Sequence, residues 1–282
     1  MNHASTTGLS IKLKKVINSN CKLGEGLCIQ NGNVAWVDII SNQIFLANDF
    51  SIDVFPTKNK PSVIYDIFEN EIIFGSDVGL TLLNRLTEEE IILENSSHMH
   101  NAIEFRSNDG GRCAQHQLLG FMHREGPETK PGFIYRVSGD TWSLLDDTIH
   151  IPNTFVEIDP SKIIISDSLT GKIWLFELDS NGILLNKKIW AKLEVGETPD
   201  GGCRIAGFVL IAIWDGAAIA VFTKGGELIQ KLTLPVIRPT NCKYDALKGQ
   251  LWVTSASEGL SKDQLKEYPD SGNTFVFDLE FL

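Results

Sequence analysis

A similar pattern recurs six times along this chain of 282 residues. In each repeat a short apolar segment is followed by a break of small or acidic residues and then by a second apolar segment. Short runs that are rich in β-branched and aromatic residues and bounded by Gly, Asn, Asp and Pro are typical of strands joined by tight turns. The first apolar segments are centred on Trp36, Phe74, Leu119, Ile164, Leu210 and Trp252, roughly 38 to 46 residues apart.

A regular period of this length, with several strands in each unit, predicts an all-β fold, a six-bladed β-propeller. We expect these first apolar segments to be the innermost strands of the blades, with the SD, SDS and WDG residues in the hairpins that follow them. The alternative is a β-sandwich or two small β domains, neither of which needs a regular period. No low-complexity linker divides the chain, so residues 1–282 are predicted to form one domain, with residues 1–15 as a pairing strand or a short tail.

Composition excludes several classes of partner. The formal net charge is -11, which argues against nucleic acid because phosphate contacts need a basic face. No run approaches the roughly 18 apolar residues that span a membrane, and the first residues lack the apolar core of a signal peptide, so we expect a cytoplasmic protein without a membrane partner. The five scattered cysteines form no CxxC pair and are expected to be reduced structural thiols.

Three polar segments, LGEG, IPN and TPDGG, come just before predicted innermost strands. Loops at one mouth of a propeller channel converge, so each segment is expected to place one oxygen-bearing side chain there. Glu25, Asn153 and Asp200 would supply two carboxylates and an amide oxygen, which suit Ca²⁺, Mg²⁺ or Mn²⁺, and also Zn²⁺ at low coordination number. Each of the three residues could instead serve only in a turn.

A fourth segment, FRSNDGG, is denser in polar groups. Arg106 presents several fixed donors that could bind a substrate hydroxyl or carboxylate, and the alternative is an exposed turn. His98 and His100 would share one face of a strand, where a polar outer surface is the commoner use than a pair of metal ligands. No G-x-S-x-G elbow and no Walker loop occurs, which disfavours a serine hydrolase and a phosphate-loop enzyme.

These motifs resemble, in order and spacing, those of the family that contains regucalcin (senescence marker protein), gluconolactonase and luciferin-regenerating enzyme. The resemblance runs from about Cys21 to the C-terminus. LGEG followed by AWVDI is similar to the opening signature of the family, RSNDG to its R-x-N-D-G segment, and PDG followed by Cys203 to its P-D-G-x-C segment. Asn153 with the later SDS resembles the N-G…D-S segment.

The resemblance implies a set of roles. Glu25, Asn153 and Asp200 would hold one catalytic divalent metal ion in the central channel, with Ca²⁺ expected and Zn²⁺, Mn²⁺ or Mg²⁺ as alternatives. Arg106, Asn108 and Glu125 would bind the substrate. The implied chemistry is hydrolysis of a sugar lactone or related cyclic ester, in which the metal polarises the carbonyl and activates water. Asp200 would be the general base, although a carboxylate bound to a metal is a weak base.

The chain also departs from the family pattern. Thr154 follows Asn153 where a glycine is usual, LCIQNG replaces the P-x-W-D pattern after GEG, and His123 and Arg124 precede Glu125. We therefore expect metal binding to be retained with an altered substrate. The alternative function is a non-catalytic propeller that keeps a structural cation and binds a metabolite or a protein.

Overall fold

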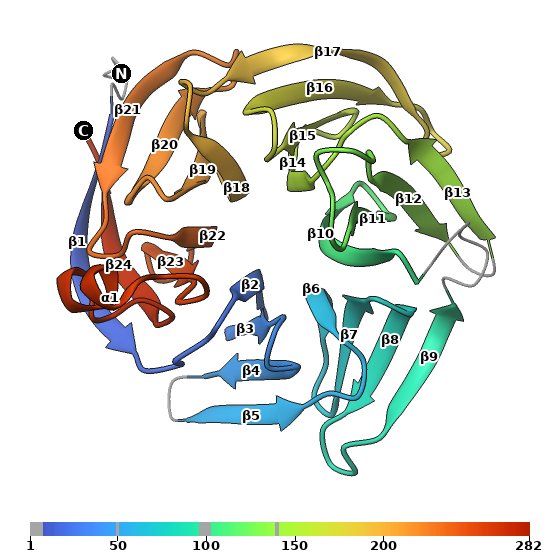
Figure 1. Ribbon diagram of the computed structural model, residues 1–282, viewed down its shortest axis with the longest axis horizontal. Coiled ribbons are helices and arrows are strands. Elements are labelled where there is room, and N and C mark those ends of the chain that lie inside the picture. Colours follow the sequence, from blue (N-terminus) through green and yellow to red (C-terminus); the bar gives the residue numbers. More distant parts are fainter. Residues whose placement is uncertain (1–7, 49–50, 96–102, 139–140) are drawn as a thin grey trace.

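The strands form six four-stranded antiparallel sheets, the blades, arranged around a central channel (Figure 1). The structure is a computed structural model that describes residues 8–48, 51–95, 103–138 and 141–282. Within these residues the only helix is α1 (Lys262–Glu267), so the predicted all-β, six-bladed propeller is confirmed. His98 and His100, considered above as a histidine pair, lie outside the described residues.

In the first three blades each strand pairs with the next one along the chain. Their strands are, for blade 1, β2 (Gly24–Gln30), β3 (Asn33–Asp38), β4 (Gln43–Ala47) and β5 (Ile52–Pro56); for blade 2, β6 (Pro61–Ile67), β7 (Glu71–Ser76), β8 (Gly79–Asn84) and β9 (Glu90–Asn95); and for blade 3, β10 (Phe105–Cys113), β11 (His116–His123), β12 (Phe133–Ser138) and β13 (Thr141–Asp146).

The last blade combines the two ends of the chain. Blades 4 and 5 repeat the order of the first three, whereas in blade 6 the fourth, outermost strand is β1, which pairs antiparallel with β24 (Figure 1). The strands are, for blade 4, β14 (Pro152–Asp159), β15 (Lys162–Asp167), β16 (Lys172–Leu178) and β17 (Leu184–Lys192); for blade 5, β18 (Thr198–Ile205), β19 (Phe208–Trp214), β20 (Ala218–Thr223) and β21 (Leu228–Thr233); and for blade 6, β22 (Pro239–Asp245), β23 (Gln250–Ser255), β24 (Thr274–Phe281) and β1 (Leu9–Ile17).

One prediction about the blades is wrong. The segments centred on Trp36, Phe74 and their four equivalents are the second strands, β3, β7, β11, β15, β19 and β23. The innermost strands are instead β2, β6, β10, β14, β18 and β22, which line the channel (Figure 1). Three of them, β2, β10 and β18, contain glycine. LGEG, IPN and TPDGG therefore lie in or directly before innermost strands. Second strands are buried on both faces, so their apolar runs gave the stronger strand signal.

The core is a ring of interfaces between blades. Six clusters of buried apolar side chains occur among the described residues, and each draws mainly on two neighbouring blades. In one of them Leu27 and Trp36 of blade 1 pack with Trp252 of blade 6, and Ile17 of β1 joins the same cluster. Neighbouring blades therefore stabilise one another around the whole ring.

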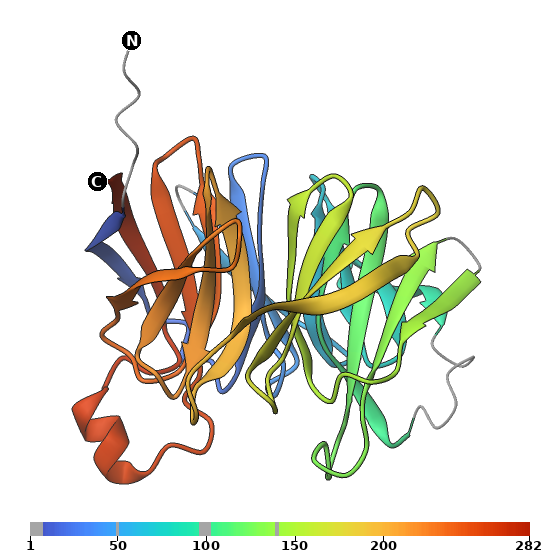
Figure 2. The same ribbon diagram turned by 90° about the horizontal axis from the view of Figure 1, so that it is seen from above.

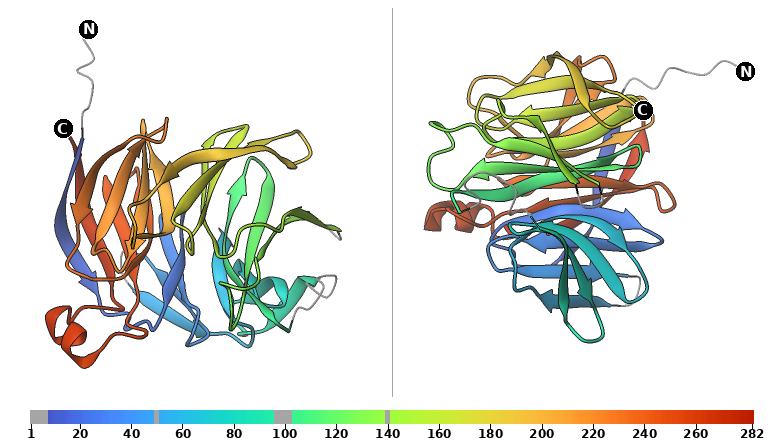
Figure 3. Two further views of the ribbon diagram at one scale, coloured as in Figure 1. Left: turned by 45° about the horizontal axis from the view of Figure 1, so that its top comes forward. Right: turned by 90° about the vertical axis from the view of Figure 1, so that its right-hand side faces the viewer.

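Seen from the side, the blades stand next to one another around the channel (Figures 2 and 3). The short helix α1 lies in the connection between β23 and β24 of blade 6 and projects from one end of the ring (Figure 2). No helix in the described part of the chain has the length and apolar character needed to cross a lipid bilayer.

Candidate functional site

Five of the six candidate residues named from the sequence meet at one cavity. This cavity of about 250 Å³ lies at the mouth of the channel where the innermost strands begin. Its lining includes Glu25, Arg106, Asn108, Asn153 and Asp200, which come from β2, β10, β14 and β18 of blades 1, 3, 4 and 5. Glu125 lies apart from them, because it is an exposed residue in the loop after β11 and does not line the cavity.

Every innermost strand carries a β-bulge near this mouth. The register with the second strand shifts between Glu25 and Cys28 in β2, between Asn153 and Val156 in β14, and between Pro199 and Gly202 in β18. β6, β10 and β22 have shifts at equivalent places. A bulge bends its strand and re-aims a side chain. The bulges thus account for the way that successive polar residues of one strand project into the channel.

Acidic residues at the ends of two second strands have a structural role. Asp38 at the end of β3 accepts hydrogen bonds from the backbone N–H groups of Lys22 and Leu23, just before Glu25, at 2.8 and 3.1 Å. Asp167 at the end of β15 accepts one from Ile151, just before Asn153, at 3.2 Å. In blades 1 and 4 these carboxylates tie the start of the innermost strand to the end of the second strand, and so fix the strand ends that carry Glu25 and Asn153.

Glu25 and Asp200 form a buried pair of carboxyl groups, 4% and 5% exposed. Burial raises the pKa of both groups well above their usual values, and the negative charge of Asp109 raises them further. The two carboxyl groups interact directly, so without a cation the pair is best satisfied when it shares a proton. A cation at this position would offset the same repulsion while both carboxylates stay ionised.

Asn153 contacts this pair directly. Its Nδ2 donates a hydrogen bond to the Asp200 carboxylate, and its Oδ1 accepts one from the backbone N–H of Thr154 at 3.1 Å. Among the described residues no group of three or more His, Cys, Asp or Glu side chains is placed to hold a metal. The candidate ligand set therefore has two carboxylates and one amide. Such an all-oxygen set fits a hard cation, provided that the amide turns its oxygen toward Asp200.

Thr154, the residue that replaces the usual glycine, has φ = +55°, in the left-handed region that β-branched residues rarely adopt. Two contacts offset this strain. Its hydroxyl donates to the backbone carbonyl of Asp200, and it lies 2.9 Å from the hydroxyl of Ser166. Thr154 thus joins blade 4 to blade 5 directly beneath two candidate ligands.

Arg106 is held by a short chain of hydrogen bonds. Its Nη1 donates to the Ser107 carbonyl and to Asn108 Oδ1, both at 3.0 Å, and Asn108 Nδ2 donates to the Pro152 carbonyl of blade 4 at 3.1 Å. Among the described residues no acceptor binds Nε or Nη2 of Arg106. The amide of Asn108 therefore orients the guanidinium, which keeps donors for a ligand in the cavity.

The sequence reasoning missed an aromatic wall. Trp214 lines the cavity, and the guanidinium of Arg238 lies 4.7 Å from the centre of its ring. Arg238 is itself fixed by an ion pair with Asp215 at 2.5 Å and by a hydrogen bond to the backbone carbonyl of Glu258. Glu258 also lines the cavity. The WDG residues are predicted only as a hairpin after an innermost strand, at the end away from the candidate ligands. Because β19 is a second strand, Trp214 lies at the same mouth as those ligands.

Comparisons with known proteins identify the family of this chain. The family described as "SMP-30/Gluconolactonase/LRE-like region" matches residues 23–257. Regucalcin of Bos taurus is 25% identical over 94% of this chain and 94% of its own. L-arabinolactonase of Azospirillum brasilense is 27% identical over 90% of this chain and 87% of its own.

Solved structures share the fold. A calcium-binding regucalcin from Agrobacterium tumefaciens superposes with a TM-score of 0.86 at 22% identity, over 95% of both chains. Luciferin-regenerating enzyme superposes with a TM-score of 0.83 at 16% identity, over 98% of this chain and 96% of its own. At these identities the likeness describes the architecture of the propeller.

Proposed function

Because this chain belongs to the SMP-30/gluconolactonase/LRE-like family, we propose that it is a divalent-metal-dependent hydrolase that opens a sugar lactone or a related cyclic ester. The convergence of Glu25, Asn153 and Asp200 from three blades on one cavity is the observation that carries this proposal. The lactonase activity named for L-arabinolactonase, a relative along nearly the whole chain, supports it.

In this proposal Glu25, Asn153 and Asp200 hold the cation, for which Ca²⁺ is the first choice. Zn²⁺, Mn²⁺ and Mg²⁺ are the alternatives, because all accept oxygen ligands. The calcium-binding description of the regucalcin from Agrobacterium tumefaciens supports Ca²⁺. When bound, the cation polarises the ester carbonyl and lowers the pKa of water.

The remaining steps belong to side chains of this protein. Nε and Nη2 of Arg106 bind the hydroxyl or ring oxygens of the lactone, while Asn108 keeps the guanidinium in place. Asp200 accepts the proton of the attacking water, because it is the carboxylate placed beside both the proposed cation and the cavity. Trp214 offers an apolar face against which a sugar ring can pack. Glu125 would reach the substrate only from outside the cavity.

A pH-stat assay tests the proposal. D-glucono-1,5-lactone and L-arabinono-1,4-lactone are added to the protein with and without Ca²⁺, Zn²⁺ or Mn²⁺, and proton release is measured above the spontaneous rate. We expect release that needs a metal and that falls at least about 100-fold in Asp200→Ala. Asp53→Asn, on the exposed strand β5, is the matched control and should leave the rate unchanged.

Two results would contradict the hydrolase. One is the absence of any lactone opening above background with each metal, and the other is an Asp200→Ala rate equal to that of the unmodified protein. Metal binding without hydrolysis would instead favour the non-catalytic propeller.

A further inference from the structure

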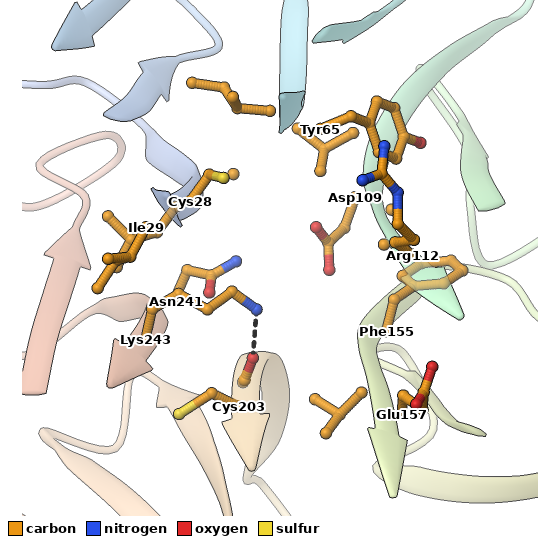
Figure 4. A pocket seen from close by; sticks show the side chains of 18 of the residues that line it. Cys28, Ile29, Tyr65, Asp109, Arg112, Phe155, Glu157, Cys203, Asn241 and Lys243 are labelled. Atoms are coloured by element: carbon orange, nitrogen blue, oxygen red, sulfur yellow. Dashed lines mark hydrogen bonds between the residues drawn. The ribbon is translucent and has the colours of Figure 1, made fainter. Parts of the chain in front are cut away.

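A second cavity, of about 350 Å³, lies deeper along the channel than the candidate site. All six innermost strands line it, through the residues that follow their bulges (Figure 4). It shares no lining residue with the first cavity. Of two neighbours in β10, Asn108 lines the first cavity and Asp109 lines the second. The proposed hydrolysis uses none of these residues.

One wall carries a positive charge that forms no ion pair with a carboxylate of the described residues, although Asp109 faces it across the cavity. The ammonium group of Lys243, on β22, donates a hydrogen bond to the carbonyl of Gly202 at 2.8 Å (Figure 4) and takes part in none of the ion pairs of the described chain. By contrast, Arg112 binds Asp66 through two hydrogen bonds of 3.1 and 2.6 Å. Lys243 therefore keeps donors for an anionic group in the cavity.

The cavity also presents hydrogen-bond acceptors. The carboxyl group of Asp109 points toward its centre from β10, opposite Asn241 and Lys243 (Figure 4). Asn241 is only 3% exposed, and its Oδ1 has no hydrogen-bond partner among the described residues. A buried acceptor without a partner costs free energy, so a ligand that donates a hydrogen bond to it would stabilise this arrangement. Asn241 itself packs against Gly201, where any side chain would collide with its amide.

The two acceptors, Asp109 and Asn241 Oδ1, and the ammonium group of Lys243 determine which ligand would be complementary to this cavity. A carboxylate would pair with Lys243, and hydroxyl groups would donate to Asp109 and to Asn241 Oδ1. The volume suits a small metabolite. A polyphosphate would meet the carboxylate of Asp109 at close range, and an apolar ligand would leave all three groups unpaired.

We propose that this second cavity is a binding site for a small hydroxycarboxylate, separate from the candidate catalytic site. A sugar acid, the class of product that lactone opening would release, has this chemistry. Only the choice of a sugar acid as the probe rests on the proposed function, because the site itself is defined by the residues that line it.

Isothermal titration calorimetry with sodium D-gluconate tests the proposal directly. We expect saturable binding to the unmodified protein that is weakened at least about tenfold in Lys243→Met, because a charge-assisted hydrogen bond is lost. Lys188→Met, the same change on the exposed outer strand β17, is the matched control and should bind gluconate normally. D-Sorbitol, which lacks the carboxylate, should not bind.

The Asp200→Asn variant separates this proposal from the proposed function, since it should lose lactone hydrolysis and still bind gluconate. Lys243→Gln, which keeps a donor to Gly202 and removes the charge, replaces Lys243→Met if circular dichroism shows that the latter does not fold. No gluconate binding to the unmodified protein, or binding that the folded Lys243 variants leave unchanged, would overturn the proposal. So would binding that is lost in Arg106→Met and kept in Lys243→Met, because gluconate would then occupy only the first cavity.

Discussion

Thr154 shows how one residue can combine backbone strain with a favourable contact. A β-branched side chain in the left-handed region costs on the order of 1–3 kcal/mol, which its hydrogen bonds to Asp200 and Ser166 offset. We predict that Thr154→Val, which keeps the strain and removes the hydroxyl, lowers the free energy of unfolding by about 2 kcal/mol. Thr154→Gly removes both and should lower it less. Urea denaturation measures the two values, and a Val variant as stable as the unmodified protein would contradict this account.

Asp109 predicts a pH dependence in the metal-free protein. Burial raises the pKa of this carboxyl from 3.8 to about 6. Between these two pH values, Asp109 is therefore protonated in the folded state and ionised in the unfolded chain. The contribution of Asp109 to the free energy of unfolding is complete below about pH 4 and is lost as the pH rises through about 6.

The measurement compares urea denaturation of the unmodified protein and Asp109→Asn in EDTA at several pH values. Because the variant cannot titrate, the stability of the unmodified protein relative to it should fall by about 3 kcal/mol between pH 4 and pH 7. Stabilities that change in parallel over this range would show that Asp109 titrates normally.

At the residue scale, the candidate ligands could be predicted from the sequence, but the side chains that surround them could not. Glu25, Asn153 and Asp200 stood out only through the family resemblance, since each is also a common turn residue. The pairing of Glu25 with Asp200, and the ring contact between Arg238 and Trp214, depend on distances between blades that no local pattern records. The family resemblance also implies that Glu125 binds the substrate, and the structure puts this residue outside the cavity.

At the scale of the strand, Asp38 should be a strong structural anchor. It is 1% exposed and accepts hydrogen bonds from four backbone N–H groups, those of Lys22, Leu23, Ile40 and Ser41. We predict that Asp38→Asn lowers the free energy of unfolding by about 2–3 kcal/mol, because the neutral amide loses charge-assisted bonds and introduces donors that face other donors. Asp53→Asn on β5 is the matched control, expected to change stability by less than about 0.5 kcal/mol. Equal stabilities in denaturant titrations would rule out the anchor.

The innermost strands are the elements that the sequence concealed. Apolar periodicity marked β3 and its five equivalents clearly, since these strands are buried on both faces. The innermost strands border a polar channel and break their alternation at the bulge, and β2, β10 and β18 carry glycine where a bulge or a neighbouring blade leaves no room. Their polar residues consequently predict loops before a strand. The number of blades was correct because the second strands keep the same period.

At the scale of the molecule, the ring is closed by contacts between residues far apart in the chain. β1 completes blade 6 beside β24, and the side chain of Gln230 on β21 exchanges two hydrogen bonds of 2.8 Å with the backbone of Leu9 on β1. Such long-range pairing is not visible in a local pattern. It explains why residues 9–17 form a strand rather than a tail.

The candidate metal site would also act at this scale, because its three ligands come from blades 1, 4 and 5 and converge at one mouth of the channel. Calorimetric titration of EDTA-treated protein with CaCl₂, comparing the unmodified chain with Glu25→Gln and Asp200→Asn, tests this site most directly. The account predicts saturable Ca²⁺ binding that is weakened more than about tenfold in each variant, since each loses one charged ligand. Ca²⁺ binding of unchanged affinity in both folded variants would contradict it.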